Sequence, residues 1–336
     1  MASTTTTAPW ITRVAAHPTS AAGVHYRAGR EHAARAAGFP MRSDLNLHYF
    51  GGRTIEHLTF TNVYLGGKPA WRPDDVKQID WALPAAMSDP HLNNVIAQYD
   101  ADGKTSTAFK PSRFLDGPLP ARVYKDVIEG FVAALDQSGA LSGFDLSTTV
   151  FNFMLPHGVV LVDGNSKGHQ ERHESDEPHL NPALAAHDEA VDSKHGLGGY
   201  HGSIHAKRGS KTDKVLYAVG VYAEGANGIV AFDKPWKSVC ATFYHELCEA
   251  RTDPDVEDSI RAGNTPAGER LLGWYSPKGG EIGDIPMDEA PTLGAVMKEV
   301  PLASGGRTVP VQLMWSNAVG GPEGPIAKRH KAAART

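Results

Sequence analysis

The residue types best suited to chemistry lie in one segment, where residues 244–254 read YHELCEARTDP. On a helix, His245, Glu249 and Asp253 recur every four residues and rise from one face. An imidazole and a carboxylate one turn apart can chelate a divalent metal, and the adjacent Glu246 can act as a base on metal-bound water. This is the logic of an H-E-x-x-H helix with Glu in place of the second His, which makes the site harder and more anionic.

Two features around this motif favour a metal site over a solvated acidic face. The helix is largely apolar, with Cys240, Phe243, Leu247 and Cys248 around the acidic pair, and charges on a buried helix need a partner. Downstream, residues 273–284 read GWYSPKGGEIGD. The paired glycines permit a tight hairpin that returns two further carboxylates to the helix.

A third metal ligand has several candidates. Glu281 and Asp284 rank first, as distant carboxylates delivered by the glycine-rich loop. His201 would give a set of two histidines and one glutamate, Asp253 is in helical register, and Asp255 follows His245 by the ten-residue spacing of some metalloprotease ligands. Each carboxylate could instead accept backbone N–H groups in a turn.

Three tyrosines are candidates to polarise a carbonyl or an oxyanion: Tyr275, Tyr200 and Tyr244. Each could equally be a core residue whose hydroxyl is hydrogen-bonded. Trp274 and Trp315 are interpreted as structural.

Composition limits the class of protein. The chain has 336 residues, 41% hydrophobic and 21% charged residues and a net charge of -5, which is typical of a globular protein of one large or two modest domains. This charge gives no case for nucleic acid or membrane partners, and no apolar run reaches the length of a membrane span. Cys240 and Cys248 would lie too far apart on one helix to bridge. Two unpaired cysteines and the lack of an evident signal peptide favour a cytoplasmic location.

Hydrophobic periodicity predicts alternating strands and helices. We expect strands at 57–64, 150–155, 159–162, 215–222 and 309–315, and helices at 74–99 with a break at Pro84, at 120–135 and at 237–251. The predicted organisation is a poorly ordered extension (1–45), one α/β (α+β) domain (46–320) that contains a His-rich polar insertion (163–198), and a frayed basic tail (321–336). A His-rich tract can bind metal, but a mobile surface insertion is the preferred interpretation.

Several segments together resemble a known family. They are FNFMLPHGV (151–159), GYH (199–201), LYAV (216–219), the motif at 245–254, GWY (273–275), GEIGD (280–284) and the segment 311–318 with its Trp-Ser-Asn triplet. In this order they resemble the phosphate-induced/EXORDIUM-type family and its bacterial and fungal relatives, which are zincin-like proteins. The resemblance covers about residues 48–320.

The resemblance implies one zincin-like domain, with a mixed sheet packed against a metallopeptidase-like active-site helix. It implies no firm activity. Members are usually secreted and often carry cysteines near the GYH and Trp-Ser-Asn segments, so the absence of those cysteines here leaves the location open between secreted and cytoplasmic.

Three hypotheses follow. The first is a metal-dependent hydrolase of peptide or amide bonds, in which His245 and Glu249 hold one divalent ion and Glu246 is the general base. Zn is the preferred ion, with Ca, Mn and Fe open. The second is a non-catalytic binding protein that the metal stabilises. The third is a metal-free acidic cluster paired with Arg251, Arg261 or Lys278. The sequence does not predict the oligomeric state.

Overall fold

A six-stranded mixed sheet forms the centre of the computed structural model, which describes residues 13–15, 39–164, 166, 192–208, 211–263 and 265–335. The strand order is β1 (Arg13–Ala15), β8 (Leu197–Arg208), β9 (Lys211–Val221), β6 (Thr149–Leu155), β3 (His57–Leu65) and β4 (Ser106–Leu115). The β1–β8 and β8–β9 pairs are antiparallel, whereas β9, β6, β3 and β4 run parallel. The predicted mixed α/β class is confirmed.

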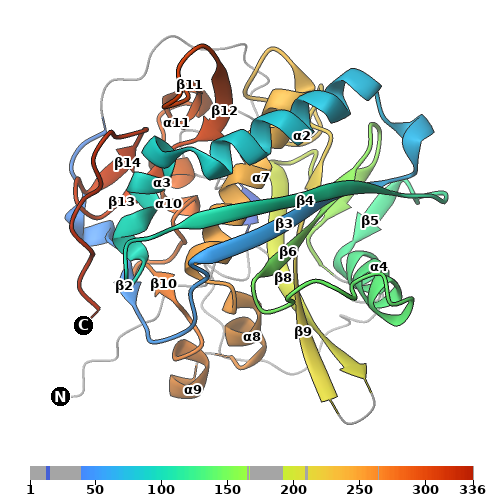
Figure 1. Cartoon of the computed structure of the whole chain (residues 1–336), viewed down its shortest axis with the longest axis horizontal. Coiled ribbons are helices and arrows are strands. Elements are labelled where there is room, and N and C mark those ends of the chain that lie inside the picture. The colour runs from blue at the N-terminus through green and yellow to red at the C-terminus, as the bar shows by residue number, and fades with distance from the viewer. Residues whose placement is uncertain are drawn as a thin grey trace, which may run out of the picture.

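Helices cover both faces of this sheet, and a hydrophobic core lies under each face. The first core packs α2 (Pro73–Ser88) and α7 (Pro235–Thr252) against β3, β6 and β9. The second packs α4 (Lys125–Gln137) against the other face. Figure 1 shows α2 and α7 together near the centre of the molecule and α4 apart from them. Because β6 is covered on both faces, all seven of its residues are buried.

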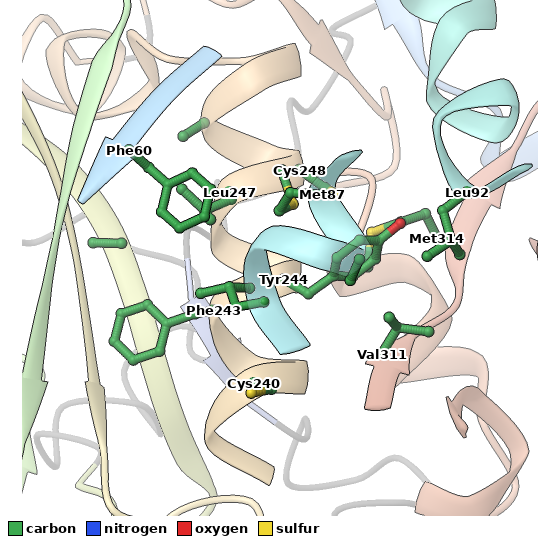
Figure 2. Close-up of a cluster of buried hydrophobic side chains, with 14 of the residues drawn as sticks. Phe60, Met87, Leu92, Cys240, Phe243, Tyr244, Leu247, Cys248, Val311 and Met314 are labelled. Carbon is green, nitrogen blue, oxygen red and sulfur yellow. The ribbon is translucent and has the colours of Figure 1, made fainter. Parts of the chain in front are cut away.

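The helix α7 is buried along most of its length, from Ser238 to Thr252. Its apolar side lies in the first core, where Figure 2 shows Phe243, Tyr244 and Leu247 among side chains of α2, α3 (Pro90–Ile96), β3, β12 and β13. Each large apolar side chain buried in this way contributes about 1.5–3 kcal/mol. This packing fixes the direction of the polar side chains on α7.

Most predicted elements lie where the periodicity places them, but some differ. The helix α2 continues through Pro84 to Ser88, because Leu83, Ala86 and Met87 keep its buried face packed and this offsets the lost backbone hydrogen bond. The segment predicted as a helix from 120 begins instead with the strand β5 (Arg122–Tyr124), which pairs with β7 (Val160–Val162).

Short elements connect and cover this framework. Near the N-terminal half they are η1 (Ser43–Leu45), β2 (His48–Tyr49), η2 (Lys68–Ala70) and η3 (Ala97–Tyr99). After α7 they are α8 (Val256–Arg261), α9 (Pro266–Glu269), β10 (Trp274–Tyr275), α10 (Asp284–Glu289), α11 (Leu293–Val296), β11 (Met297–Pro301), β12 (Thr308–Gln312), β13 (Met314–Ser316) and β14 (Gly321–Glu323). The segment predicted as one strand at 309–315 is thus divided between β12 and β13.

The ends of the predicted domain also differ from expectation. The predicted frayed tail contains β14, and its backbone bonds back to the body through Ile326 N–H to His91 O (3.0 Å) and Ala333 N–H to Gln98 O (2.7 Å). Leu45, at the end of the predicted extension, is buried. Most of the His-rich insertion and most of the predicted N-terminal extension lie outside the described residues. No described helix has the length and apolar character that crossing a membrane requires.

Candidate metal centre

The polar side of α7 carries His245, Glu246 and Glu249, and each of these side chains is 0% exposed. One helical turn brings His245 and Glu249 together, with Nε2 of the imidazole 2.9 Å from Oε1 of the carboxylate. Nε2 nevertheless has no hydrogen-bond partner among the described residues. The predicted i, i+4 pair is therefore formed, and its imidazole lone-pair position is left for another group.

The orientation of His245 is fixed from the opposite side by Gln312 at the end of β12. The Gln312 amide donates through Nε2 to the Gly283 carbonyl (2.6 Å), so its Oε1 must face the imidazole Nδ1 at 2.9 Å. An amide oxygen only accepts, so Nδ1 carries a proton and Nε2 is the nitrogen that faces Glu249 and that a metal would bind in place of a proton. An outer hydrogen bond of this kind is what orients histidine ligands in metal sites.

The loop before α10 brings two more carboxylates to α7, as predicted, although not through a hairpin. The strand β10 pairs with β2, and a turn closed by Ser276 N–H to Gly280 O (3.0 Å) reverses the chain. Asp284 then starts α10. The backbone N–H groups of Gly283 and Asp284 donate to Oε1 of Glu249 at 3.2 and 3.1 Å.

These contacts produce a first set of three possible metal ligands: His245, Glu249 and Asp284. One ligand atom from each lies within 4.8 Å of the others. Oδ2 of Asp284 accepts from Glu281 N–H (3.2 Å), whereas Oδ1, 3.8 Å from His245 Nε2, has no hydrogen-bond partner among the described residues. The loop backbone thus holds the carboxylate and leaves one oxygen for the site.

The strand β8 contributes His201 from the sheet side. Its Nδ1 lies 3.4 Å from Glu246 Oε2 and 3.6 Å from Glu249 Oε2, and its Nε2 lies 3.4 Å from the Asp253 carbonyl and 3.8 Å from Glu281 Oε1. A second set of possible ligands results: His201, Glu249 and Glu281, again within 4.8 Å. Glu249 belongs to both sets.

A glycine on β8 permits this close approach. Gly199 precedes His201 by two residues and faces the same side of the sheet. A Cβ at Gly199 would lie 3.2 Å from Oε1 of Glu246 and 2.4 Å from the Val219 carbonyl. The intervening Tyr200 points to the other face, into the second core beside Tyr217.

Two other predicted site residues, Asp253 and Asp255, belong to neither set of possible ligands. Asp253 does not continue the helical register, because α7 ends at Thr252 and a residue before proline avoids helical dihedrals. Asp253 belongs to neither ligand set, and its Oδ1 accepts from Gly273 N–H (2.8 Å). Asp255 pairs with Arg53 and Lys214, each at 2.9 Å.

The predicted tyrosines are buried side chains of the cores. Tyr275 packs against Val256 and Leu272, and Tyr244 lies in the first core on the apolar side of α7. The predicted role of Tyr275 as a polarising hydroxyl stays a prediction. Cys240 and Cys248 are buried free thiols, as expected.

The basic residues proposed to neutralise the cluster bind other groups. Arg251 donates to Ser106 O and Thr107 Oγ1. Arg261 pairs with residues of α4 and α8, and Lys278 pairs with Asp44 at 2.5 Å. Within the described part of the chain, neither a lysine nor an arginine forms an ion pair with Glu249, Glu281 or Asp284. The pairing with Arg251, Arg261 or Lys278 that the third hypothesis proposed is therefore wrong.

Burial and mutual repulsion act strongly on these carboxylates. Burial raises the pKa of Glu281 and of Asp284 well above the ordinary value, and neighbouring Glu249 adds to both. Burial alone would also raise the pKa of Glu249, but His245 and His201 hold it at about 2. Burial would lower the pKa of His201, whereas Glu281, Glu246 and Glu249 raise it well above its usual range. The buried groups of the cluster therefore favour bound protons or cations over full ionisation.

The donor set fits a divalent metal. Buried atoms with no hydrogen-bond partner among the described residues converge there: His201 Nδ1, His245 Nε2, Glu249 Oε2, both Glu281 oxygens and Asp284 Oδ1. Imidazole with carboxylate oxygen suits Zn, Mn and Fe, and a purely oxygen-rich set would suit Ca. The residues thus fit a metal without fixing its identity.

Two residues of this site escaped the sequence prediction. Gln312 was part of a matching segment but was not assigned a role, although it is a polar residue in the otherwise apolar run 309–315. Gly283 allows the loop to touch His245, since a Cβ there would lie 2.4 Å from Nδ1. The isolated amide was a readable signal, whereas the glycine contact depends on tertiary structure.

Access to the cluster is restricted. His201 and Asp284 are 1% and 2% exposed, and Glu281 is 0% exposed. A surface cavity of about 720 Å³ near Arg53 shares no lining residue with the cluster. The short strand β1 covers the edge of β8 beside the site, with Val14 opposite Gly199 and Arg13 opposite Tyr200.

Comparison of the chain with protein-family models, with curated proteins and with solved structures finds no match.

Proposed function

We propose that the protein is a metal-dependent hydrolase of peptide or amide bonds, with a zincin-like arrangement of sheet and helix. The observation that carries this proposal is the first ligand set, His245, Glu249 and Asp284, which is buried, oriented and without a basic partner in the described chain. Glu246 adjoins this set without belonging to it. A carboxylate beside a metal but outside its ligands is the requirement for a general base.

Each residue has a distinct part in this proposal. A divalent cation bound there would polarise a carbonyl and lower the pKa of water. Gln312 keeps the proton on Nδ1 of His245, and the N–H groups of Gly283 and Asp284 hold Glu249 in place. Glu246 accepts a proton from the attacking water and returns it to the leaving nitrogen.

The edge of β8 supports a peptide as the substrate class. The strand lies directly above Glu246 at Gly199, and its pairing with β1 is antiparallel. An extended peptide that replaced β1 would pair with the same backbone groups and place a carbonyl near Glu246, which is the β-strand addition used by many peptide-binding proteins. In this proposal β1 occupies the substrate position and must leave it.

The first test compares Glu246→Gln with Glu257→Gln in the full chain and in a chain without residues 1–38. Glu257 is a buried glutamate of α8 paired with Lys125 at 2.6 Å. With a mixed peptide library as substrate, Glu246→Gln should retain the metal and lose at least about 100-fold in turnover. Glu257→Gln should retain turnover, and the shortened chain should exceed the full chain. A fully active Glu246→Gln variant would contradict the mechanism.

Complete burial of the cluster favours a second candidate, a non-catalytic protein that a metal stabilises. In that case a chelator would lower the melting temperature of the full chain, and removal of residues 1–38 would produce no turnover. A metal at one hundred times its Kd adds about 2.7 kcal/mol to stability. Turnover by the shortened chain therefore separates the two candidates.

A further inference from the structure

The buried carboxylates exceed what one divalent ion can neutralise. Glu246, Glu249, Asp253, Glu281 and Asp284 are all buried around two imidazoles. One divalent cation offsets two formal negative charges and leaves the remainder in a region of low dielectric, which is costly. Two divalent cations offset four. Each carboxylate that this ion does not offset must be neutralised by a proton or by a second cation.

We propose that a second divalent cation binds between His201, Glu249 and Glu281, so that the protein holds a two-metal centre in which Glu249 bridges the ions. This inference rests on the proposed function, because it adds a neighbour to the same metal. The two sets approach Glu249 from different sides: Oε1 lies 2.9 Å from His245, and Oε2 lies 3.6 Å from His201.

The proton position on His201 supports this second site. Its Nε2 faces the Asp253 carbonyl at 3.4 Å, and a carbonyl only accepts, so the proton is favoured on Nε2. Nδ1 then directs a lone pair at the oxygens of Glu246 (3.4 Å) and Glu249 (3.6 Å), and it has no hydrogen-bond partner among the described residues. The position between Nδ1 and these two carboxylates is therefore one that a positive charge must fill, either a proton or a metal cation.

Glu281 supplies the third, independent observation. Its side chain is 0% exposed, both of its oxygens lack a hydrogen-bond partner among the described residues, and its Oε1 lies 3.8 Å from Nε2 of His201. A buried carboxylate with two unsatisfied oxygens is costly unless a cation or a proton neutralises it. In two-metal sites, the second ion helps to hold both the attacking and the leaving group of a hydrolytic displacement.

Metal stoichiometry tests this proposal. The purified full chain is stripped with a chelator and equilibrated with Zn²⁺, and bound zinc is measured by elemental analysis. We expect two equivalents per chain in the wild type, and one in each of His201→Ala, Glu281→Gln and Asp284→Asn. We also expect exchange coupling between two bound ions in the electron paramagnetic resonance spectrum of Mn²⁺-loaded wild type. Circular dichroism establishes that each variant is folded.

The outcomes separate this inference from the proposed function. A single equivalent in the wild type overturns the two-metal centre, whatever the variants do. If that equivalent persists in Glu281→Gln and disappears in Asp284→Asn, the first ligand set and the proposed hydrolase stand. If it disappears only in the His201 and Glu281 variants, the proposed catalytic metal fails. No bound zinc in folded wild type overturns both.

Discussion

Two neighbouring regions carry acidic groups, α8 on one side and α7 with α10 on the other, and the partners of these groups differ. On α8 and just before it, Asp255, Glu257 and Asp258 pair with lysine and arginine from other elements, including Lys214 at 2.9 and 2.5 Å. On α7 and α10, Glu249 and Asp284 have backbone N–H groups and imidazoles around them, and in the described chain no lysine or arginine is paired with them.

This contrast shows how a structural ion-pair network differs from a site prepared for a cation. The acidic groups of the α8 network have lysine and arginine countercharges within the protein, although Oε2 of Glu257 has no hydrogen-bond partner among the described residues. The α7 cluster is buried and contains polar atoms without a hydrogen-bond partner among the described residues. Proteins keep such unfavourable groups at sites where a bound ligand satisfies them. Substitutions at matched positions in the two regions can break or sharpen this difference.

The largest effect is expected from Glu249→Gln compared with Glu257→Gln. Glu249 belongs to both ligand sets, so its loss should weaken divalent cation binding by more than about 100-fold. Loss of a group that only hydrogen-bonds to a ligand typically weakens binding by about 10–100-fold. Glu257→Gln should leave cation affinity within a factor of two or so, because its partners are Lys125 and Arg261. Calorimetric titration with Zn²⁺ measures both. Equal Zn²⁺ affinities of the two variants would contradict the proposed difference between the α7 cluster and the α8 network.

A second comparison concerns two buried amides. Gln312→Leu removes the acceptor that fixes His245 and should lower metal affinity by about 10–100-fold. Gln98→Leu removes an amide of equal size that bonds to Val95 O and Ser316 Oγ, so it should reduce stability alone. If Gln98→Leu weakened zinc binding as much as Gln312→Leu, the effect would be one of folding and not of ligand orientation.

A third comparison uses glycines. Gly283→Ala places a Cβ 2.4 Å from His245 Nδ1 and should cost about 1–3 kcal/mol, because it forces the loop and the imidazole apart. Gly130→Ala in α4 meets no atom within 4 Å and should add about 0.4–1 kcal/mol. Urea unfolding of the metal-free protein gives both values. A neutral Gly283→Ala would mean that the loop does not lie against the imidazole.

The smallest effect concerns the α8 network and pH. Partial burial would raise the pKa of Asp258, but Lys214 and His205 hold it below its ordinary value of 3.8. A lowered carboxyl pKa contributes stability that is present above the unfolded pKa and is lost as the pH falls through the folded one. Lys214→Met should therefore flatten the acid side of the stability profile by about 1 kcal/mol or less, and exposed Lys104→Met should not. Chemical unfolding between pH 3 and 6, roughly the range in which carboxylates titrate, measures this slope.

Helix periodicity and turn chemistry predicted much of the region around α7, because both depend only on residues close together in the sequence. The spacing of His245 and Glu249 determines their contact on any helix, and the apolar residues 239–248 predict that the helix is buried. The glycine-rich loop was enough to predict that Glu281 and Asp284 return to α7. These inferences needed only helix geometry and turn chemistry.

The remainder depends on contacts between distant segments. The end of α7 before Pro254 removes Asp253 from the ligand face, although its number fits the helical period. The ten-residue spacing from His245 predicted Asp255 as a ligand, but in the folded chain Asp255 pairs with Arg53 and Lys214. Neither pairing has a local signature, because each partner comes from a different part of the sheet or its loops.

The ligands come from three separate segments: the strand β8 at residue 201, the helix α7 at 245–249 and the loop at 281–284. An ion that joins them acts as a cross-link in the folded chain and closes long loops that are costly in entropy. Without the ion, the polar contacts between residues 281–284 and α7 are two backbone donors to Glu249 and the Gln312 amide that links Gly283 to His245. Amide hydrogen exchange in that loop should therefore report the metal more sensitively than global unfolding does, since such segments open locally before the core.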